Sequence, residues 1–106
     1  MGLFGFFGTA DINAGVERYQ KSDGAVLIDV RTVEEYRDGH IENSVNIPVD
    51  RISSIEDAVK DKDTRLFVYC RSGGRSGRAV SHLKQMGYKN VENIGGISKF
   101  RGRVVK

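Results

Sequence analysis

One short segment, residues 70–76, has the composition of an anion-binding loop beside a reactive thiol. Cys70 ends the apolar run Leu66–Cys70, and Arg-Ser-Gly-Gly-Arg-Ser follows it directly. Such a run is typical of a buried parallel strand, and open α/β sheets bind ligands where their strands end. Glycine lets successive amide N–H groups turn inward, and a helix N-terminus adds to their positive field. The segment therefore predicts an anion-binding loop around Cys70.

A thiol in these surroundings should ionise more readily than an ordinary cysteine. Amide dipoles and the guanidinium groups of Arg71, Arg75 and Arg78 would stabilise the thiolate, which is the nucleophilic form. Such sites lower a thiol pKa from ~8.5 to roughly 3.5–7.5. The alternative is an inert buried cysteine, since free cysteine often packs in cores. We favour the reactive form, because an inert position has no need of a basic, glycine-rich turn.

Other interpretations of this segment fit the spacing less well. A Walker phosphate-binding loop ends in Gly-Lys-Ser/Thr, whereas this one ends in Gly-Arg-Ser. One Cys and two His residues are too few for a zinc site with sensible spacing. His40 could act as a base for Cys70, but nothing in the sequence brings them together, and His82 is expected on a solvated helix face. We predict no metal and no cofactor.

Strands and helices are expected to alternate along the chain. Two runs are nearly continuous in apolar and β-branched or aromatic residues, as in strands buried on both faces. Strands alternating with helices imply an α/β layer fold around a mostly parallel sheet. The expected strands are 25–30, 45–47, 66–70 and 91–94, and the expected helices are 11–20, 32–38, 53–60 and 76–86.

Three of the helix ends have their own sequence signals. Thr32-Val-Glu-Glu35 and Ser53-Ser-Ile-Glu56 both have the form of a capping box, which starts a helix. Gly87 stands where the C-terminal cap of the last helix belongs.

Length and composition are those of one globular domain over residues 1–106. Hydrophobic residues make up 39% and charged residues 29% of the chain, and no apolar run approaches the ~20 residues of a spanning helix. The apolar stretch 1–8 lacks the features of a signal peptide and is expected to pack on the domain, with contact to a partner or a membrane surface as the alternative. We therefore expect a cytoplasmic protein without membrane contact. The net charge of +3 is weak evidence for nucleic acid, so no nucleic-acid partner is expected.

Three stretches, in order and over nearly the full length, resemble a known family. The first holds Asp29-Val-Arg31, Glu35-Tyr36, Gly39-His-Ile41 and Asn46-Ile-Pro48, the second is Cys70–Ser76, and the third is Gly95-Gly-Ile97. They are similar to the signatures of the single-domain rhodaneses, which are thiosulfate or polysulfide sulfurtransferases. The resemblance implies a rhodanese-like three-layer α/β fold, with a mostly parallel five-stranded sheet flanked by helices.

The resemblance also implies an activity. Cys70 would take a sulfane sulfur from a small anionic donor, such as thiosulfate or a persulfide or polysulfide, and hold it as a persulfide. Cyanide or a thiol, of a small molecule or of a protein, would then accept the sulfur. The chain has one cysteine, so that acceptor must come from outside. The loop residues that would bind the substrate are Arg71, Ser72, Gly73, Gly74, Arg75 and Ser76.

Asp29 and Arg31 are the expected supporting residues. They end a strand near the same sheet edge, where they could orient the loop by an ion pair or cap the following helix. His40, within Gly-His-Ile, is expected to be a hydrogen-bonded turn residue. Where the family often has tryptophan, this chain has Phe100, which keeps an aromatic core residue. The basic C-terminal residues Arg101, Arg103 and Lys106 are expected to be solvated, with a docking patch for an acidic partner as the alternative.

Loop length separates the competing activities. Four residues lie between Cys70 and Arg75, as in sulfurtransferases, whereas the related Cdc25-type phosphatases and arsenate reductases have five. A shorter loop suits sulfur better than a tetrahedral phosphate. A rhodanese-like module that only docks on a partner is the alternative from another class, but it would need neither Cys70 nor Arg75.

Overall fold

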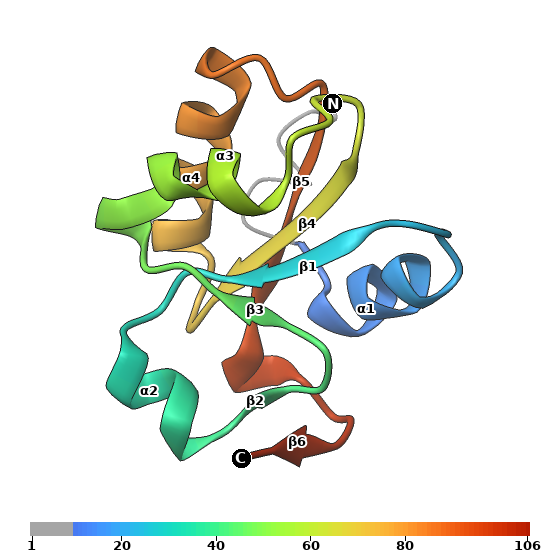
Figure 1. Cartoon of the computed structure of the whole chain (residues 1–106). Coiled ribbons are helices and arrows are strands. Elements are labelled where there is room, and N and C mark those ends of the chain that lie inside the picture. The colour runs from blue at the N-terminus through green and yellow to red at the C-terminus, as the bar shows by residue number, and fades with distance from the viewer. Residues whose placement is uncertain (1–9) are drawn as a thin grey trace, which may run out of the picture.

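Four parallel strands form the centre of the computed structural model, which describes residues 10–106 (Figure 1). Their order is β3-β1-β4-β5, and each neighbouring pair is parallel. All four predicted strands are confirmed, with ends shifted by one or two residues. The expected packing of the stretch 1–8 lies outside the described residues. The strands are β1 (Val26–Asp29), β3 (Val45–Asn46), β4 (Arg65–Cys70) and β5 (Asn90–Gly96).

The expectation of a fifth strand in this sheet is wrong for the described part of the chain. β2 (His40–Ile41) instead pairs antiparallel with β6 (Val104–Val105), as a separate two-stranded sheet. The chain turns after Ile41 through Asn43, at φ +73°, before it enters β3, and the Ile41 N–H donates to the Tyr69 hydroxyl at 3.1 Å. β2 therefore stays beyond the carboxyl ends of the parallel strands.

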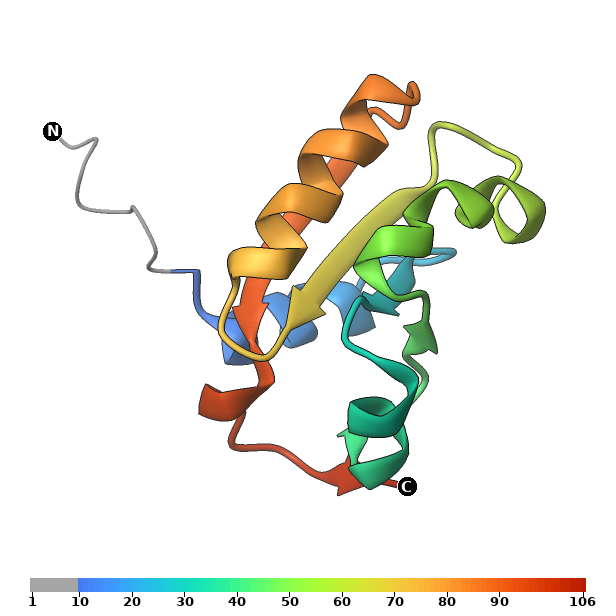
Figure 2. The same ribbon diagram turned by 90° about the vertical axis from the view of Figure 1, so that its left-hand side faces the viewer.

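Helices cover both faces of the parallel sheet, which confirms the three-layer α/β class (Figures 1 and 2). α1 (Ile12–Gln20) packs on one face; α4 (Gly74–Gln85), the 3₁₀ helix η2 (Val49–Ser54) and α3 (Ile55–Ala58) lie on the other. α2 (Val33–Asp38) and the 3₁₀ turn η3 (Ile97–Lys99) lie beyond the carboxyl edge. Between residues 10 and 106, no helix has the length and apolarity that crossing a membrane requires.

The side chains of β4 alternate between two apolar cores, as the pleat of a strand requires. Leu66, Val68 and Cys70 belong to the core beneath α4, whereas Phe67 and Tyr69 belong to the core beneath α1. All five are 1% exposed or less. The alternation directs the Cys70 sulfur to the side of the sheet where α4 begins.

One of the two predicted capping boxes is present. The Thr32 side chain accepts from the N–H of Glu35, and the Glu35 carboxylate accepts from the N–H of Thr32, at the start of α2. The box at Ser53–Glu56 is wrong. The chain is already in 3₁₀ turns from Val49, and the residue before α3 has helical φ and ψ and makes no side-chain cap. A capping side chain needs an extended residue at that position.

α4 begins earlier than expected and ends within one residue of its expected end. It starts at Gly74, two residues before the predicted Ser76, because the glycine-rich loop itself forms the first turn. At the other end Gly87 has φ +104°, its N–H donates to the Lys84 carbonyl at 3.0 Å, and the Tyr88 N–H donates to Leu83 at 3.1 Å. These two bonds form a Schellman motif, so the predicted glycine cap is confirmed.

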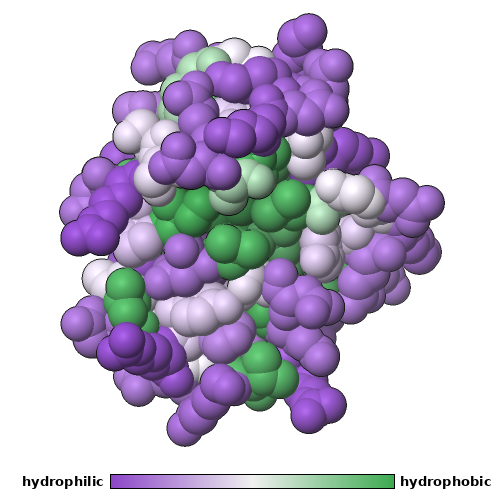
Figure 3. All heavy atoms as spheres, viewed as in Figure 1, coloured by the Kyte–Doolittle hydropathy of each residue, from purple (hydrophilic) through white to green (hydrophobic). Residues whose placement is uncertain are grey.

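Apolar side chains reach the surface around β3 (Figure 3). β3 pairs with only the second half of β1, since it is two residues long. A small hollow of about 140 Å³ opens there, and Val45 is 43% exposed. The residues that line it are all apolar: Val26, Ile28, Val45, Ile47, Ile55, Ala58 and Val59.

Gly15 of α1 should not tolerate alanine, although alanine favours helices. A Cβ there would lie 2.4 Å from the Cβ of Ile94 in β5, so α1 would have to move off the sheet. Overpacking of this kind costs about 1–3 kcal/mol and outweighs the ~1 kcal/mol gained in helix propensity. We expect Gly15→Ala to unfold at a lower urea concentration than the wild type.

Gly77→Ala in α4 is the matched control. Its Cβ would lie 3.5 Å from the side-chain nitrogen of Asn93, which is an ordinary contact, so stability should be equal or slightly higher. Equal urea midpoints for the two variants would contradict the close packing of α1 on β5.

Candidate active site

The Cys70 sulfur lies at the carboxyl end of β4 and accepts hydrogen bonds from the loop that follows it. The Gly73 N–H donates to Sγ at 3.0 Å, and the Ser76 hydroxyl lies 3.4 Å from the same atom. The backbone N–H groups of Ser72 and Ser76 also favour the thiolate, since both lower the pKa of Cys70. The loop predicted from the sequence is therefore wrapped around Sγ, with its donors directed at one atom.

Two opposing effects act on the ionisation of Cys70. Burial of the sulfur is the larger single effect and raises the pKa of the thiol. The Ser76 hydroxyl and the amides of Ser76, Gly73 and Ser72 each lower that pKa, and together they outweigh burial. The pKa of Cys70 therefore lies below that of an ordinary thiol, in the direction predicted from the sequence.

Two glycines allow the loop to take this path. Gly73 has φ +109°, a left-handed conformation, and it is the residue from which α4 starts. Gly96, at the end of β5, lies under the loop, where a Cβ would be 2.2 Å from the carbonyl oxygen of Arg71. A side chain at position 96 would push the loop away from the sheet.

Asn93 of β5 is part of the site, and the sequence reasoning missed it. Its Nδ2 donates to the Gly73 carbonyl at 3.1 Å, and its Oδ1 accepts from the Ser76 hydroxyl at 2.8 Å and from the Gly95 N–H at 3.0 Å. Ser76 has one hydroxyl proton, and three acceptors compete for it: Asn93 Oδ1, the Gly73 carbonyl at 3.1 Å and the Cys70 sulfur. Asn93 thus ties the loop to β5 and holds Ser76 beside the sulfur. Within a short strand pattern, a lone asparagine gives no signal of this role.

The partly exposed guanidinium group of Arg75 is paired with a carboxylate of the same chain. It forms a two-pronged ion pair with Glu35 of α2, with Nη1–Oε1 at 2.7 Å and Nη2–Oε2 at 3.1 Å. The same carboxylate completes the Thr32 capping box, so one side chain joins α2 to the loop. The Arg75 bond lowers the pKa of Glu35 to about 2, against partial burial. The sequence showed Glu35 in the capping box, but not its partner.

Asp29 and Arg31 form an ion pair with each other, at 2.7 Å, and both are buried. Arg31 also donates to the Gly39 carbonyl at 2.7 Å, at the end of α2. Thr32 is the N-cap of α2, so neither residue caps the start of that helix, but Arg31 bonds the carbonyl of its C-cap residue, Gly39. The pair fixes the segment between β1 and β2 and makes no hydrogen bond to residues 71–76. Its support of the site remains a prediction.

Arg71 and Arg78 are exposed, and neither is in an ion pair within residues 10–106. Their expected attraction for an anionic substrate remains a prediction. His40 has its Nδ1 2.8 Å from the Tyr36 carbonyl and is stacked on the Tyr36 ring, as expected of a hydrogen-bonded structural residue. His82 is exposed on α4, as predicted. Among residues 10–106, no group of three or more His, Cys, Asp or Glu side chains is placed to hold a metal.

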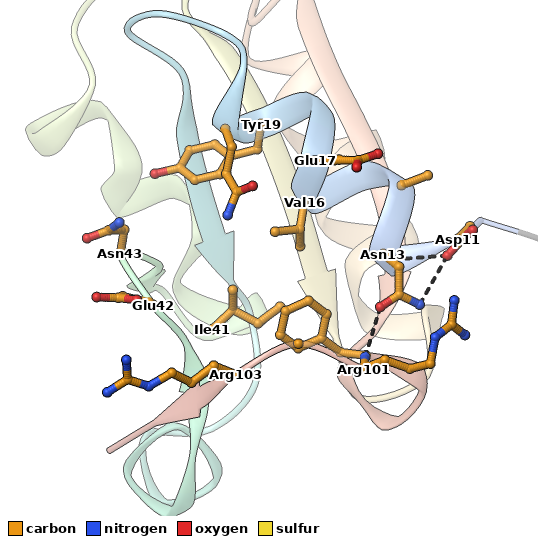
Figure 4. A pocket seen from close by; sticks show the side chains of 14 residues that line it. Asp11, Asn13, Val16, Glu17, Tyr19, Ile41, Glu42, Asn43, Arg101 and Arg103 are labelled. Atoms are coloured by element: carbon orange, nitrogen blue, oxygen red, sulfur yellow. Dashed lines mark hydrogen bonds between the residues drawn. The ribbon is translucent and has the colours of Figure 1, made fainter.

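Two hollows lie near this end of the molecule, and the larger is not at the sulfur. It has about 570 Å³, and Figure 4 shows it between α1, the turn after β2 and the C-terminal segment, with Val16 and Ile41 inside. Asn13 holds its wall in place by accepting from the Arg101 N–H at 2.8 Å. The smaller hollow, of about 290 Å³, adjoins the loop at Arg71.

Comparison with known proteins identifies this arrangement. A model of the rhodanese-like domain matches residues 13–103. The chain belongs to the rhodanese-like domain family.

Several relatives of this family are similar to the chain. Thiosulfate sulfurtransferase PspE of Escherichia coli is 44% identical over 71 residues, which cover 66% of this chain and 68% of PspE. The adenylyltransferase and sulfurtransferase uba4 of Ogataea parapolymorpha is 36% identical over 95 residues, 89% of this chain but only 24% of uba4. A solved structure, described as a rhodanese with anions from E. coli, is 40% identical with a TM-score of 0.72 over 77% of this chain and 98% of that one.

The rhodanese-like domain of this chain keeps an aromatic side chain at Phe100. Phe100 is half-buried and packs against the core beneath α1, as expected from the sequence. Arg101, Arg103 and Lys106 are exposed, but the segment is more than a solvated tail, since Val104–Val105 pairs with β2. Docking of an acidic partner on these basic residues stays a prediction.

Removing the Ser76 hydroxyl should raise the pKa of Cys70, because this hydroxyl favours the thiolate. Hydrogen bonds to charged groups contribute about 1.5–3 kcal/mol, so the rate of alkylation below that pKa should fall roughly tenfold. The rate of alkylation of Cys70 in Ser76→Ala, measured across pH, tests this. Ser81→Ala, an exposed serine of the same helix, is the control. Identical pH profiles for the two variants would show that Ser76 does not stabilise the thiolate.

Glu35→Gln should reduce the loss of folding stability that the wild type shows as the pH falls below about 4.5. Because the pKa of Glu35 is lowered from 4.5 to about 2 in the folded state, its ion pair stabilises the fold above about pH 4.5, and this stabilisation is lost as pH falls toward 2. Urea midpoints at pH 6 and pH ~3 should therefore differ more in the wild type than in the variant. Glu34→Gln, the exposed neighbour in α2, should behave as the wild type. An unchanged pH dependence in Glu35→Gln would exclude the pair as an anchor of α2.

Proposed function

We propose that this chain is a sulfurtransferase that carries a sulfane sulfur on Cys70 as a persulfide. The observation that carries the proposal is the convergence of loop N–H groups on a buried sulfur whose pKa is lowered. The sulfurtransferase names of PspE and uba4 support it. The chain spans about a quarter of uba4 and two thirds of PspE, so the activity of the whole relatives is carried over only as part of this proposal.

In the first step, the Cys70 thiolate attacks the outer sulfur of a donor such as thiosulfate. A new S–S bond forms, the S–S bond of thiosulfate breaks, and sulfite leaves with the bonding electron pair. The negative charge then lies on the outer sulfur of the persulfide. The amides of Ser72, Gly73 and Ser76, which favour the thiolate of Cys70, act on the inner sulfur, Sγ. Persulfide and polysulfide donors would follow the same displacement with a different leaving group. This is covalent catalysis by an activated nucleophile.

In the second step, an external nucleophile takes the sulfur. The thiolate of an acceptor attacks the outer sulfur, Cys70 leaves as a thiolate, and the enzyme is restored; cyanide would leave as thiocyanate. Cys70 is the one cysteine of the chain, so no internal thiol can act as acceptor. The proposed partners are thus a small anionic donor and a thiol or cyanide acceptor, with protein thiols included among the thiols. No cofactor takes part. A cytoplasmic location is part of the proposal and rests on the sequence alone.

The alternative is a rhodanese-like module that only binds a partner protein. Such a module would need neither a nucleophile with a lowered pKa nor the Ser76–Asn93 contacts that hold a donor beside it. A phosphatase or arsenate reductase activity is less favoured, since four residues separate Cys70 from Arg75.

Treatment with thiosulfate should add the mass of one sulfur atom to the intact protein. The adduct should map to Cys70, disappear on addition of cyanide, and be absent from Cys70→Ser. Intact mass spectrometry measures all three. If thiosulfate, polysulfide and a low-molecular-weight persulfide all leave the mass unchanged, the proposed function is wrong.

A further inference from the structure

The hollow of about 290 Å³ beside the loop is built from four segments at the carboxyl edge of the sheet. Arg71 of its wall directly follows Cys70. The other residues come from the segment after β1, from α2 and from η3, and α2 and η3 lie below the β4–α4 loop in Figure 2. A molecule in this hollow would therefore be next to the chain segment that holds the sulfur. The lining residues are Arg31, Glu35, Asp38, Arg71, Ile97 and Ser98.

Half of the charges in this wall are already compensated inside the protein. Arg31 is paired with buried Asp29, and Glu35 is paired with Arg75. Each of these pairs has at least one hydrogen bond of 2.7 Å. In addition, Arg31 donates to a backbone carbonyl, and Glu35 accepts from the N–H of Thr32 in the capping box. They shape the hollow, but they offer no free charge to a ligand.

Two charges of opposite sign remain available. Arg71 and Asp38 are both exposed, and neither takes part in an ion pair or a side-chain hydrogen bond within residues 10–106. Arg71 comes from the loop and Asp38 from the last residue of α2, so they approach the hollow from different elements. Half-buried Ile97 adds apolar surface, and the Ser98 backbone is fixed by its N–H bond to the Arg71 carbonyl at 3.1 Å.

We infer that this hollow binds the sulfur acceptor as a zwitterionic thiol, of the class of a free amino acid or short peptide. Arg71 binds its carboxylate, Asp38 binds its ammonium group, and the methylene carbons lie on Ile97. The inference rests on the proposed function and names the acceptor class for it. The volume equals that of about ten water molecules, at ~30 Å³ each, which suits a small amino thiol rather than a folded protein surface.

Single-turnover transfer from preloaded Cys70 tests the charge assignment. The acceptors are cysteine, 3-mercaptopropionate, which lacks the ammonium group, and cysteine methyl ester, which lacks the carboxylate. Exposed ion pairs contribute up to about fivefold each at low salt. Asp38→Asn should therefore slow transfer to cysteine about threefold to fivefold and leave 3-mercaptopropionate unchanged. Arg71→Gln should slow transfer to cysteine and to 3-mercaptopropionate about threefold to fivefold more than it slows transfer to the methyl ester.

Comparing each acceptor between variants removes its intrinsic reactivity from the result. Asp57→Asn, an exposed acid of α3, is the control and should change no acceptor. Equal slowing of all three acceptors in Asp38→Asn, or no slowing of cysteine, would overturn the inference while leaving the sulfurtransferase proposal in place.

A second measurement separates the inference from the proposed function, because it needs no sulfur transfer. S-Methylcysteine, a zwitterion without a reactive thiol, should slow alkylation of Cys70 by a neutral reagent in the wild type and lose that effect in Asp38→Asn. Protection without sulfur loading would refute the proposed function but support the binding site. If Cys70 accepts sulfur, but S-methylcysteine does not protect it from alkylation and Asp38→Asn does not discriminate among the acceptors, only the binding site is refuted.

Discussion

A buried thiolate needs stabilising groups that are already in place when the proton leaves, because the protein interior cannot reorganise as water does. Cys70 is 1% exposed, and the groups that offset its burial are the Ser76 hydroxyl and three loop amides. Their effect depends on the orientation of each N–H group. If one peptide group of the loop turned its N–H away from Cys70, that N–H would no longer reach the sulfur. Most other contacts around the site serve to hold this loop in one shape.

The loop is anchored from two sides by elements that neighbour β4. On the β5 side, Asn93 bonds the Gly73 carbonyl, and Gly96 lets the strand lie directly under Arg71. On the β1 side, Glu35 of α2 binds Arg75. The strand order explains this arrangement, because β4 lies between β1 and β5, and the segments that follow all three strands meet at one edge.

The arginines of the loop consequently have different environments. The charge of Arg75 is compensated by Glu35, so its contribution to the site is the position of the loop rather than a free positive charge. Arg71 is exposed and adjoins the smaller hollow, opposite Asp38. Backbone amides thus supply the positive potential on the side of the loop that faces the sulfur. On the side that faces solvent, the exposed guanidinium group of Arg71 supplies it. In the proposed reaction, the single cysteine requires the acceptor thiol to come from another molecule.

The sequence by itself determined the α/β class, the four parallel strands, the Thr32 capping box, the Gly87 cap and the loop around Cys70. These depend on local patterns: apolar runs, capping spacings and a glycine-rich turn after a strand. It did not determine the second sheet of β2 and β6, the failure of the Ser53 box, the Glu35–Arg75 pair or the role of Asn93. Glu35 and Arg75 are 40 residues apart, and Ser76 and Asn93 are 17 apart. Such partners are chosen by the strand order and by the register that pairs Asn93 with Val68, just before the bulge at Ile94, and only the folded sheet decides these.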